Sequence, residues 1–207
     1  RMMETQMQAL PSNDSKEKTL LEEWKLSITP VNDEKELRQI KRHMGHSADC
    51  FSKAFRVKNS NRDNVFWNYY DKHNYHKEDI HYWYHGSRNM NCLSILHNGL
   101  ILNPKAPKVG HMFGYGIYLA PKAKKSIGYT SLNGSFWVHG TSDKAYLFVM
   151  KTVYKSPYHV YTWTSGMKSL TKSRISPHDA VFAHAGTSLR NDEVVIFDDA
   201  QVTLQYI

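Results

Sequence analysis

The sequence predicts an α+β fold, and three observations lead to this prediction. Segments with strand-like composition outnumber helical segments along the 207 residues. The two kinds do not alternate as they do in the βαβ units of a doubly wound parallel sheet. The chain also carries no internal repeat or heptad pattern of the kind found in solenoids and coiled coils. A hydrophobic content of 41% is sufficient for one domain with a buried core.

The N-terminal segment is expected to be attached only loosely to this domain. Residues 1–18 are polar and are interrupted by Pro11, which is typical of a loose tail. Residues 19–24 fit a short helical turn that docks onto the domain, and Pro30 ends this segment. We therefore expect residues 1–30 to be a flexible or loosely docked segment and residues 31–207 to form the folded domain.

The remaining elements follow from hydrophobic periodicity and from helix-ending residues. Asn32 or Asp33 can cap a helix in which Leu37, Ile40 and Met44 recur at helical spacing. Two further helices are expected at residues 89–98, which Gly99 ends, and at residues 122–129, which follow Pro121. Strands are expected at residues 51–57, 80–84, 117–120, 145–154 and 158–163.

Other segments are predicted to be connections or are ambiguous. Residues 65–70 are rich in aromatic side chains and fit either a helix or a strand. Residues 193–207 predict one or two closing strands with a break near Asp198 and Asp199. Loops are expected where polar residues, glycine or proline gather, at residues 59–64, 103–110, 131–142 and, for the most part, 165–190.

The charge of the chain favours anionic partners. The net charge is +8, which suits nucleic acid, another polyanion or a phosphate-bearing ligand, but which also serves solubility alone. No run of 18 apolar residues is present, so no membrane span is expected. The N-terminus does not resemble a signal peptide, and the two cysteines, Cys50 and Cys92, favour reduced thiols. We expect an intracellular protein, from nucleus or cytoplasm or of bacterial or viral origin, that is not secreted.

Three polar residues occur in or beside short apolar strands, where an unused polar group is costly. His85 ends one predicted strand and is followed by Gly86 and Ser87. Tyr118 lies in a second strand, directly after a glycine-flanked turn. Glu193 begins a third segment of sequence Glu-Val-Val-Ile-Phe. This pattern indicates a ligand site built from a histidine, a tyrosine and a carboxylate.

Several motifs in this order resemble the catalytic domain of the poly(ADP-ribose) polymerase family, the diphtheria-toxin-like ADP-ribosyltransferases with a His-Tyr-Glu triad. The resemblance covers residues 82–206 and implies two small antiparallel-rich sheets around an NAD cleft, with flanking helices. It rests on the motifs at Tyr84–Ser87, His111–Ala120, Lys124–Tyr129, Asn191–Phe197 and Asp199–Tyr206.

The resemblance implies that NAD is the substrate and that ADP-ribose passes to an acceptor with release of nicotinamide. The expected acceptor is a protein, including this chain itself, and elongation to poly(ADP-ribose) is also expected. Bond cleavage proceeds through an oxocarbenium-like state, which an adjacent anion stabilises. Glu193 is the candidate for this anion. Asp192 is its nearest competitor, but alternation along a strand places it on the opposite face.

The resemblance also assigns roles around the nicotinamide. His85 is expected to hydrogen-bond the adenosine-side ribose, the Gly86 backbone to hold the carboxamide, and Ser87 to add a hydrogen bond. Tyr118 and Tyr129 are expected to enclose the nicotinamide ring between two aromatic faces.

Two residues of the predicted helix 122–129 complete this set. Ser126 is expected to donate to the carboxamide oxygen. Lys125 either reaches Glu193 or the acceptor, as a lysine of the family does, or is solvated like its neighbours Lys122 and Lys124.

Two loops are expected to contact the substrates. The loop 103–112 should lie over NAD, and the loop 165–190 should help to select the acceptor. Their basic or histidine side chains are Lys105, Lys108 and His111 in the first loop and Lys168, Lys172, Arg174 and Arg190 in the second.

Other kinds of function are compatible with only parts of this sequence. The chain could be a catalytically weak binding module of the same fold that recognises nucleic acid or another polyanion. A related RNA 2′-phosphotransferase would need an arginine-rich site in place of the Glu193 segment, and the sequence shows none. No metal site is predicted, because the histidines and cysteine that have helical spacing lack further ligands; they are His43, His46, Cys50, His73 and His76.

Overall fold

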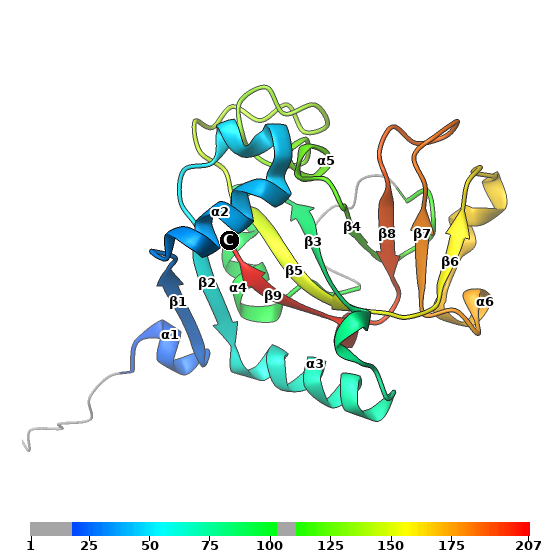
Figure 1. The fold of residues 1–207 in the computed structure, drawn as a ribbon, viewed down its shortest axis with the longest axis horizontal. Coiled ribbons are helices and arrows are strands. Elements are labelled where there is room, and N and C mark those ends of the chain that lie inside the picture. Colours follow the sequence, from blue (N-terminus) through cyan, green and yellow to red (C-terminus); the bar gives the residue numbers. More distant parts are fainter. Residues whose placement is uncertain (1–17, 103–110) are drawn as a thin grey trace, which may run out of the picture.

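The computed structural model describes residues 18–102 and 111–207, and its architecture is the predicted α+β fold (Figure 1). The strands are β1 (Leu26–Pro30), β2 (Phe55–Asn59), β3 (Ile80–Gly86), β4 (Ile117–Leu119), β5 (Leu147–Val153), β6 (Pro157–Val160), β7 (Ala180–Ala183), β8 (Glu193–Ile196) and β9 (Val202–Tyr206). The α-helices are α1 (Leu20–Glu23), α2 (Glu34–Met44), α3 (Ser60–Lys72), α4 (Cys92–Asn98), α5 (Ala123–Ile127) and α6 (Lys172–Ile175).

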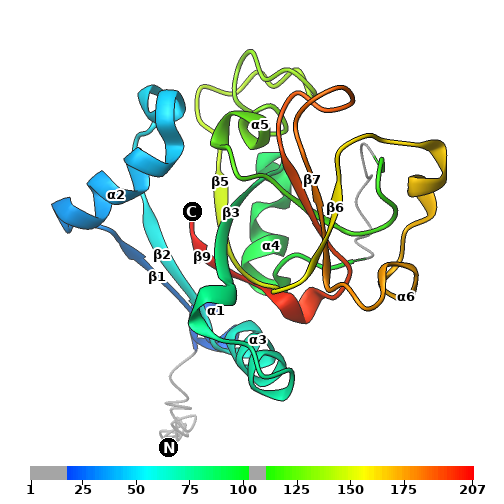
Figure 2. The same ribbon diagram turned by 45° about the vertical axis from the view of Figure 1, so that its right-hand side comes forward.

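The strands form two sheets, as the resemblance implied. One has five strands in the order β1-β2-β9-β5-β3, and the other has four strands in the order β4-β8-β7-β6. The strand pairs are antiparallel except β6 and β7, which are parallel. Helices α2 and α3 lie near the two ends of β2 (Figure 2), and α4 packs its buried side chains into the core beside the five-stranded sheet.

The first strand was not predicted from the sequence. β1 pairs antiparallel with β2, so that Leu26 lies opposite Asn59 and Pro30 opposite Phe55. Leu26 is buried and Ser27 is exposed, which fits the alternation of an edge strand. The division of the chain at residue 31 remains a prediction, but the five-stranded sheet begins before that residue.

Two predictions between residues 45 and 64 were wrong, and local capping explains the second. A 3₁₀ helix, η1 (Gly45–Cys50), precedes the strand, which begins at Phe55 rather than at residue 51. The polar run 59–64 is not a loop but the start of α3. The side-chain oxygen of Asn59 accepts a hydrogen bond from the Arg62 backbone N–H at 3.1 Å. A capping residue followed by a polar first turn has the same composition as a loop.

The segment 165–190 contains more regular structure than predicted. It holds a 3₁₀ helix, η4 (Ser165–Ser169), then α6, and then β7 in the interior of the four-stranded sheet. β7 has only four residues, which is too short for a periodic signal. The closing segment forms two strands in different sheets, β8 and β9, which η5 (Asp199–Gln201) separates at the predicted break.

The two sheets share one hydrophobic core. A single cluster of buried side chains includes Val57 from β2, Leu119 from β4, Phe148 from β5, Val194 from β8 and Leu204 from β9. The sheets also touch through their backbones, because Tyr84 and Ala120 exchange two N–H···O bonds of 2.9 Å. The ends of β3 and β4 therefore meet at a fixed point.

Candidate active site

Three strands converge at the junction between the sheets. In the pairing of β4 with β8, Leu119 lies opposite Val194, and the same register places Glu193 opposite Ala120. Ala120 is in turn bonded to Tyr84, the residue before His85. The junction therefore brings the predicted histidine, tyrosine and glutamate from three distant parts of the sequence to one place.

Glu193 forms a nearly buried ion pair with Lys125. The Lys125 Nζ lies 2.8 Å from Glu193 Oε1, and the two side chains are only 12% and 10% exposed. Burial raises the pKa of the Glu193 carboxyl, while the charge and the hydrogen bond of Lys125 oppose this rise. The structure therefore places Lys125 in contact with Glu193 rather than in solvent like its neighbours. Buried ion pairs seldom add stability, so this pair is a candidate for chemistry.

The neighbouring carboxylate has a different environment. Asp192 Oδ1 accepts a hydrogen bond from the Ala185 backbone N–H at 2.7 Å, across the turn between β7 and β8. Asp192 therefore stabilises this turn, whereas Glu193 contacts Lys125.

His85 is held in one tautomer. Its Nδ1–H donates to the backbone carbonyl of Tyr118 at 3.0 Å. Burial lowers the pKa of the imidazole, which favours the neutral ring. Nε2 is then an unprotonated acceptor, as a hydrogen bond from a ribose hydroxyl requires.

Tyr118 is anchored through its hydroxyl. The oxygen accepts from the Phe113 backbone N–H at 3.0 Å, and the hydroxyl donates to the Gly114 carbonyl at 2.7 Å. Burial raises the pKa of this phenol, so the group stays neutral. Gly114 has φ of +82°, and a Cβ there would lie 2.1 Å from the Leu170 carbonyl oxygen, so only glycine fits this turn.

Gly86 allows helix α5 to approach β3 closely. A Cβ at Gly86 would lie 1.7 Å from the backbone oxygen of Ser126. Ser126 is itself buried. The Ser87 hydroxyl oxygen accepts a hydrogen bond from the Asn91 side-chain amide at 2.9 Å. Gly86 and Ser126, which are predicted to hold the carboxamide, are thus in direct contact, and Ser87 follows Gly86 in the chain.

Tyr129 has an aromatic neighbour that sequence reasoning missed. Its ring stacks on Trp137, with centroids 5.8 Å apart and an angle of 19° between the planes. Burial, together with the negative charge of Glu193, raises the pKa of the Tyr129 phenol. The adjacent aromatic residues Phe136 and Trp137, within an otherwise polar connection, are the signal that could have identified this neighbour.

The basic and histidine side chains of the two predicted substrate loops lie partly outside the described residues and partly against other groups of the protein. Lys105 and Lys108 lie outside the described residues, whereas His111 lies 6.2 Å from Tyr118 between ring centroids. Several cations of the second loop already have partners in the protein. Lys172 pairs with Asp198 at 2.5 Å, Arg174 donates to Ser169, and Lys168 lies over the Trp163 ring.

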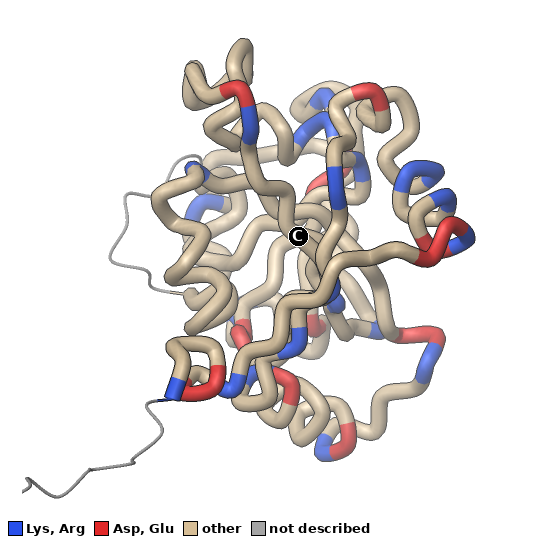
Figure 3. Tube along the Cα trace, turned by 90° about the vertical axis from the view of Figure 1, so that its left-hand side faces the viewer, with Lys and Arg blue, Asp and Glu red and all other residues tan. Residues whose placement is uncertain are grey.

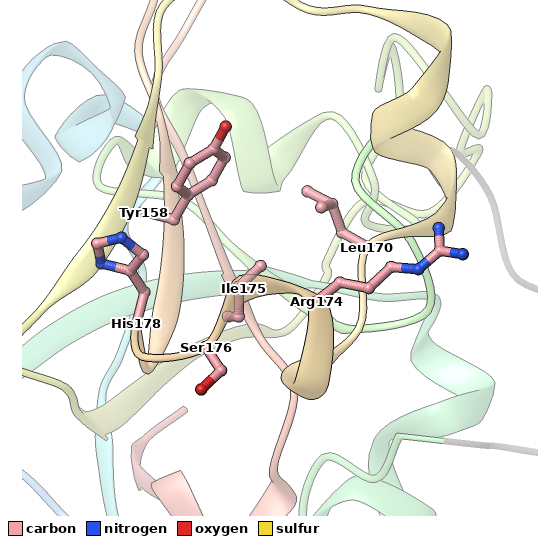
Figure 4. A pocket seen from close by; sticks show the side chains of 6 residues that line it. All are labelled: Tyr158, Leu170, Arg174, Ile175, Ser176 and His178. Atoms are coloured by element: carbon pink, nitrogen blue, oxygen red, sulfur yellow. The ribbon is translucent and has the colours of Figure 1, made fainter.

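A cavity of about 260 Å³ lies away from this junction. Figure 4 shows its lining at α6 and β6, and β6 is the strand of its sheet farthest from β4. It shares no residue with the predicted NAD-binding set, but most of its lining belongs to the predicted acceptor loop 165–190; its lining residues are Tyr158, Leu170, Arg174, Ile175, Ser176 and His178.

The described residues contain neither a metal-binding cluster nor a membrane-spanning helix. Within residues 18–102 and 111–207, no three histidine, cysteine, aspartate or glutamate side chains are grouped so as to hold a metal ion. No helix in the described part of the chain is long and apolar enough to cross a membrane.

Known proteins with similar sequences carry one family name. A family model described as the poly(ADP-ribose) polymerase catalytic domain matches residues 33–207. The poly(ADP-ribose) polymerase of Drosophila melanogaster is 32% identical over 143 residues, which cover 60% of this chain and 14% of that protein.

Two further relatives match shorter stretches. Poly(ADP-ribose) polymerase 2 of Homo sapiens is 47% identical over 57 residues, covering 26% of this chain and 10% of that protein. The tankyrase of Caenorhabditis elegans is 32% identical over 112 residues, covering 54% and 5%. The chain therefore spans only a small part of each relative. The family match covers most of the chain, and the two-sheet fold agrees with it. The chain therefore belongs to the poly(ADP-ribose) polymerase catalytic domain family, whose substrate is NAD.

Proposed function

We propose that this chain transfers ADP-ribose from NAD to an acceptor, with release of nicotinamide. The observation that carries the proposal is the nearly buried Glu193–Lys125 pair at the junction of the two sheets. A carboxylate in such a place meets developing positive charge with little competition from water. The neutral His85 ring beside Tyr118 supports the same reading.

The donor is bound by groups around this pair. The nicotinamide ring lies between Tyr118 and Tyr129, and its carboxamide is held by the Gly86 backbone and the Ser126 hydroxyl. His85 Nε2 accepts a hydrogen bond from a hydroxyl of the adenosine-side ribose. These contacts fix the leaving group relative to Glu193, which lowers the entropic part of the barrier.

The transfer step breaks one bond and forms one. The bond from ribose C1′ to the nicotinamide nitrogen breaks, and its electron pair neutralises the pyridinium ring that leaves. The ribose becomes oxocarbenium-like, and the Glu193 carboxylate stabilises its charge. The acceptor oxygen or nitrogen then bonds to C1′ and loses its proton to a base.

Glu193 also suits elongation. The rise of its pKa on burial makes the carboxylate a better base than one in water. It can bind the 2′-hydroxyl of the donor ribose and polarise the hydroxyl of an incoming ADP-ribose chain. We propose a protein acceptor for the first transfer, including this chain itself, and an intracellular site of action.

Incubation with labelled NAD tests the proposal. The expected result is nicotinamide release together with label on the protein, and mass spectrometry then gives the acceptor residue and the chain length. Asp192→Asn is the matched control for Glu193→Gln, because the two positions are adjacent and the amide oxygen of asparagine can still accept from Ala185 N–H.

One result would contradict transfer. If the unaltered protein binds benzamide, a nicotinamide mimic, but releases no nicotinamide from NAD, it is a catalytically weak binding module of this fold rather than a transferase.

A further inference from the structure

The connection 131–142, which follows α5, is tied into a fixed shape. Its ends are joined by a backbone bond of 2.9 Å from Ser142 N–H to the Ser131 carbonyl. The Trp137 backbone N–H donates to the Gly128 carbonyl at 2.9 Å, and the Gly140 backbone N–H donates to the Ser135 hydroxyl oxygen at 2.8 Å. This connection is therefore a built surface beside the candidate active site.

Two adjacent aromatic side chains of the connection are exposed. Phe136 is 60% exposed and Trp137 is 52% exposed. Trp137 stacks on Tyr129, and Phe136 packs edge-on against Trp137 with centroids 4.6 Å apart. Paired aromatic rings that remain open to solvent next to a functional site are suited to stack on a planar ligand.

A polar cavity adjoins these rings. Its volume is about 170 Å³, and its lining residues include Arg88, Ser131, Thr141 and Ser142. Arg88 directly follows Ser87 and forms no ion pair with any residue that the structure describes. A guanidinium without an ion pair, on a cavity lined by residues that carry hydroxyl groups, can supply donors to a phosphate group.

The rings and part of the cavity lining come from one stretch of the chain. Val138, which lines the cavity, is the residue after Trp137, so the rings and the cavity are neighbours. At about 30 Å³ for each water molecule, the cavity has room for several waters and so for a phosphate, but not also for a base.

We propose that Arg88 and the connection 131–142 bind the terminal nucleotide of a phosphorylated single-stranded nucleic acid. The base stacks on the exposed Phe136 ring, whose plane is almost perpendicular to that of Trp137, and the terminal phosphate occupies the cavity beside Arg88. The net charge of +8 favours a polyanion over a short phosphopeptide. Acidic and basic residues are interspersed along the trace in Figure 3.

Fluorescence anisotropy with a labelled, 5′-phosphorylated single-stranded oligonucleotide tests the proposal without NAD. Phe136→Ala should weaken binding roughly tenfold, because base–aromatic stacking is lost. Arg88→Gln should weaken binding and reduce the slope of log K against log salt by about one. Trp137 is left intact because it supports Tyr129.

Matched controls lie outside the proposed site. Tyr161→Ala removes an aromatic ring that is 67% exposed just after β6. Lys124→Gln removes an exposed cation on α5. Both should bind the oligonucleotide like the unaltered protein. Circular dichroism checks that each variant is folded, and if Phe136→Ala does not fold, Arg88→Gln decides.

Benzamide binding, followed by thermal shift in the same samples, separates this site from the donor site. Loss of oligonucleotide binding with unchanged benzamide binding supports the proposal, whether or not the protein transfers ADP-ribose. Equal affinity of both site variants and the unaltered protein would overturn it. So would equal binding of an oligonucleotide without the terminal phosphate, or tighter binding of a phosphotyrosine peptide.

Discussion

Glu193 and Asp192 are adjacent carboxylates with different surroundings. Glu193 is nearly buried against Lys125, whereas Asp192 accepts from the backbone of a turn. Asp192 lies in the turn, one residue before β8, whereas Glu193 is the first residue of the strand, and this explains the difference. One carboxylate is therefore available for a reaction at the junction and the other for stabilising the turn.

Glu193→Gln should lower the rate of ADP-ribose transfer roughly a hundred- to thousandfold. Loss of a preorganised transition-state partner of this kind costs on the order of 2.7–4 kcal/mol. NAD affinity should change little, because the interaction strengthens as the ribose becomes cationic. Single-turnover kinetics and chain-length analysis measure both effects, and elongation should fall further than the first transfer.

The control for this prediction is Asp192→Asn, which should keep near-normal transfer. A Glu193→Gln protein that still makes long chains at the normal rate would place the catalytic anion elsewhere.

Lys125→Met should move the acid limb of the pH–rate profile to higher pH. The pKa of Glu193 is already raised by burial, and Lys125 is the group that opposes the rise. Transfer needs the ionised carboxylate, so the rate falls as the pH falls through this pKa. Without the lysine the pKa rises further, and the fall begins at higher pH. The exposed neighbour variant Lys124→Met should leave the profile in place, and an unmoved limb in Lys125→Met would show that the pair does not control the titration.

At the level of elements, the contact between α5 and β3 depends on one missing side chain. Gly86→Ala should destabilise the fold by about 1–3 kcal/mol and abolish benzamide binding, because its Cβ would lie 1.7 Å from a backbone oxygen of α5. Denaturant unfolding and calorimetry measure the two effects. Gly186→Ala is the control, since a Cβ there meets nothing within 4 Å. Normal benzamide binding by Gly86→Ala would argue against a pocket at this contact.

Elements were predictable from the sequence to different degrees. The apolar run of β3 and its continuation into His85 are visible in the sequence, and so is α4 with Gly99 at its end. β1 has five residues and β7 has four, so neither is long enough for a clear periodic pattern. Each is fixed by pairing with other strands, β1 with β2 and β7 with β6 and β8, which the local sequence does not reveal. The polar start of α3 has the composition of a loop, because helix-capping residues and turn residues are of the same amino-acid types.

At the scale of the whole molecule, the shared core predicts one cooperative unfolding transition. Leu119 in β4 is 2% exposed and belongs to the cluster that also contains strands of the five-stranded sheet. Leu119→Ala should therefore lower the free energy of unfolding of the entire described domain by about 2–5 kcal/mol. Circular dichroism and loss of benzamide binding, followed in the same denaturation, should give coincident midpoints. Separate midpoints would show that the two sheets unfold independently.

The sequence by itself determined the α+β class, the order of the motifs and the identity of the candidate site residues. Each of these depends on residue type and on local spacing, which a chain carries before it folds. The family match over residues 33–207 confirms the resemblance that those motifs indicated, while the roles of the individual site residues remain predictions.

Only the tertiary structure decided which of these residues touch. The contact of Lys125 with Glu193 joins segments that are distant in the chain, while the stacking of Trp137 on Tyr129 and the hydrogen bond of Asp192 to Ala185 depend on how two connections fold back on themselves. The contact of Lys125 with Glu193 arises from strand register and from burial at the junction of the sheets. Register and burial are properties of the assembled sheets, and no local stretch of sequence contains them.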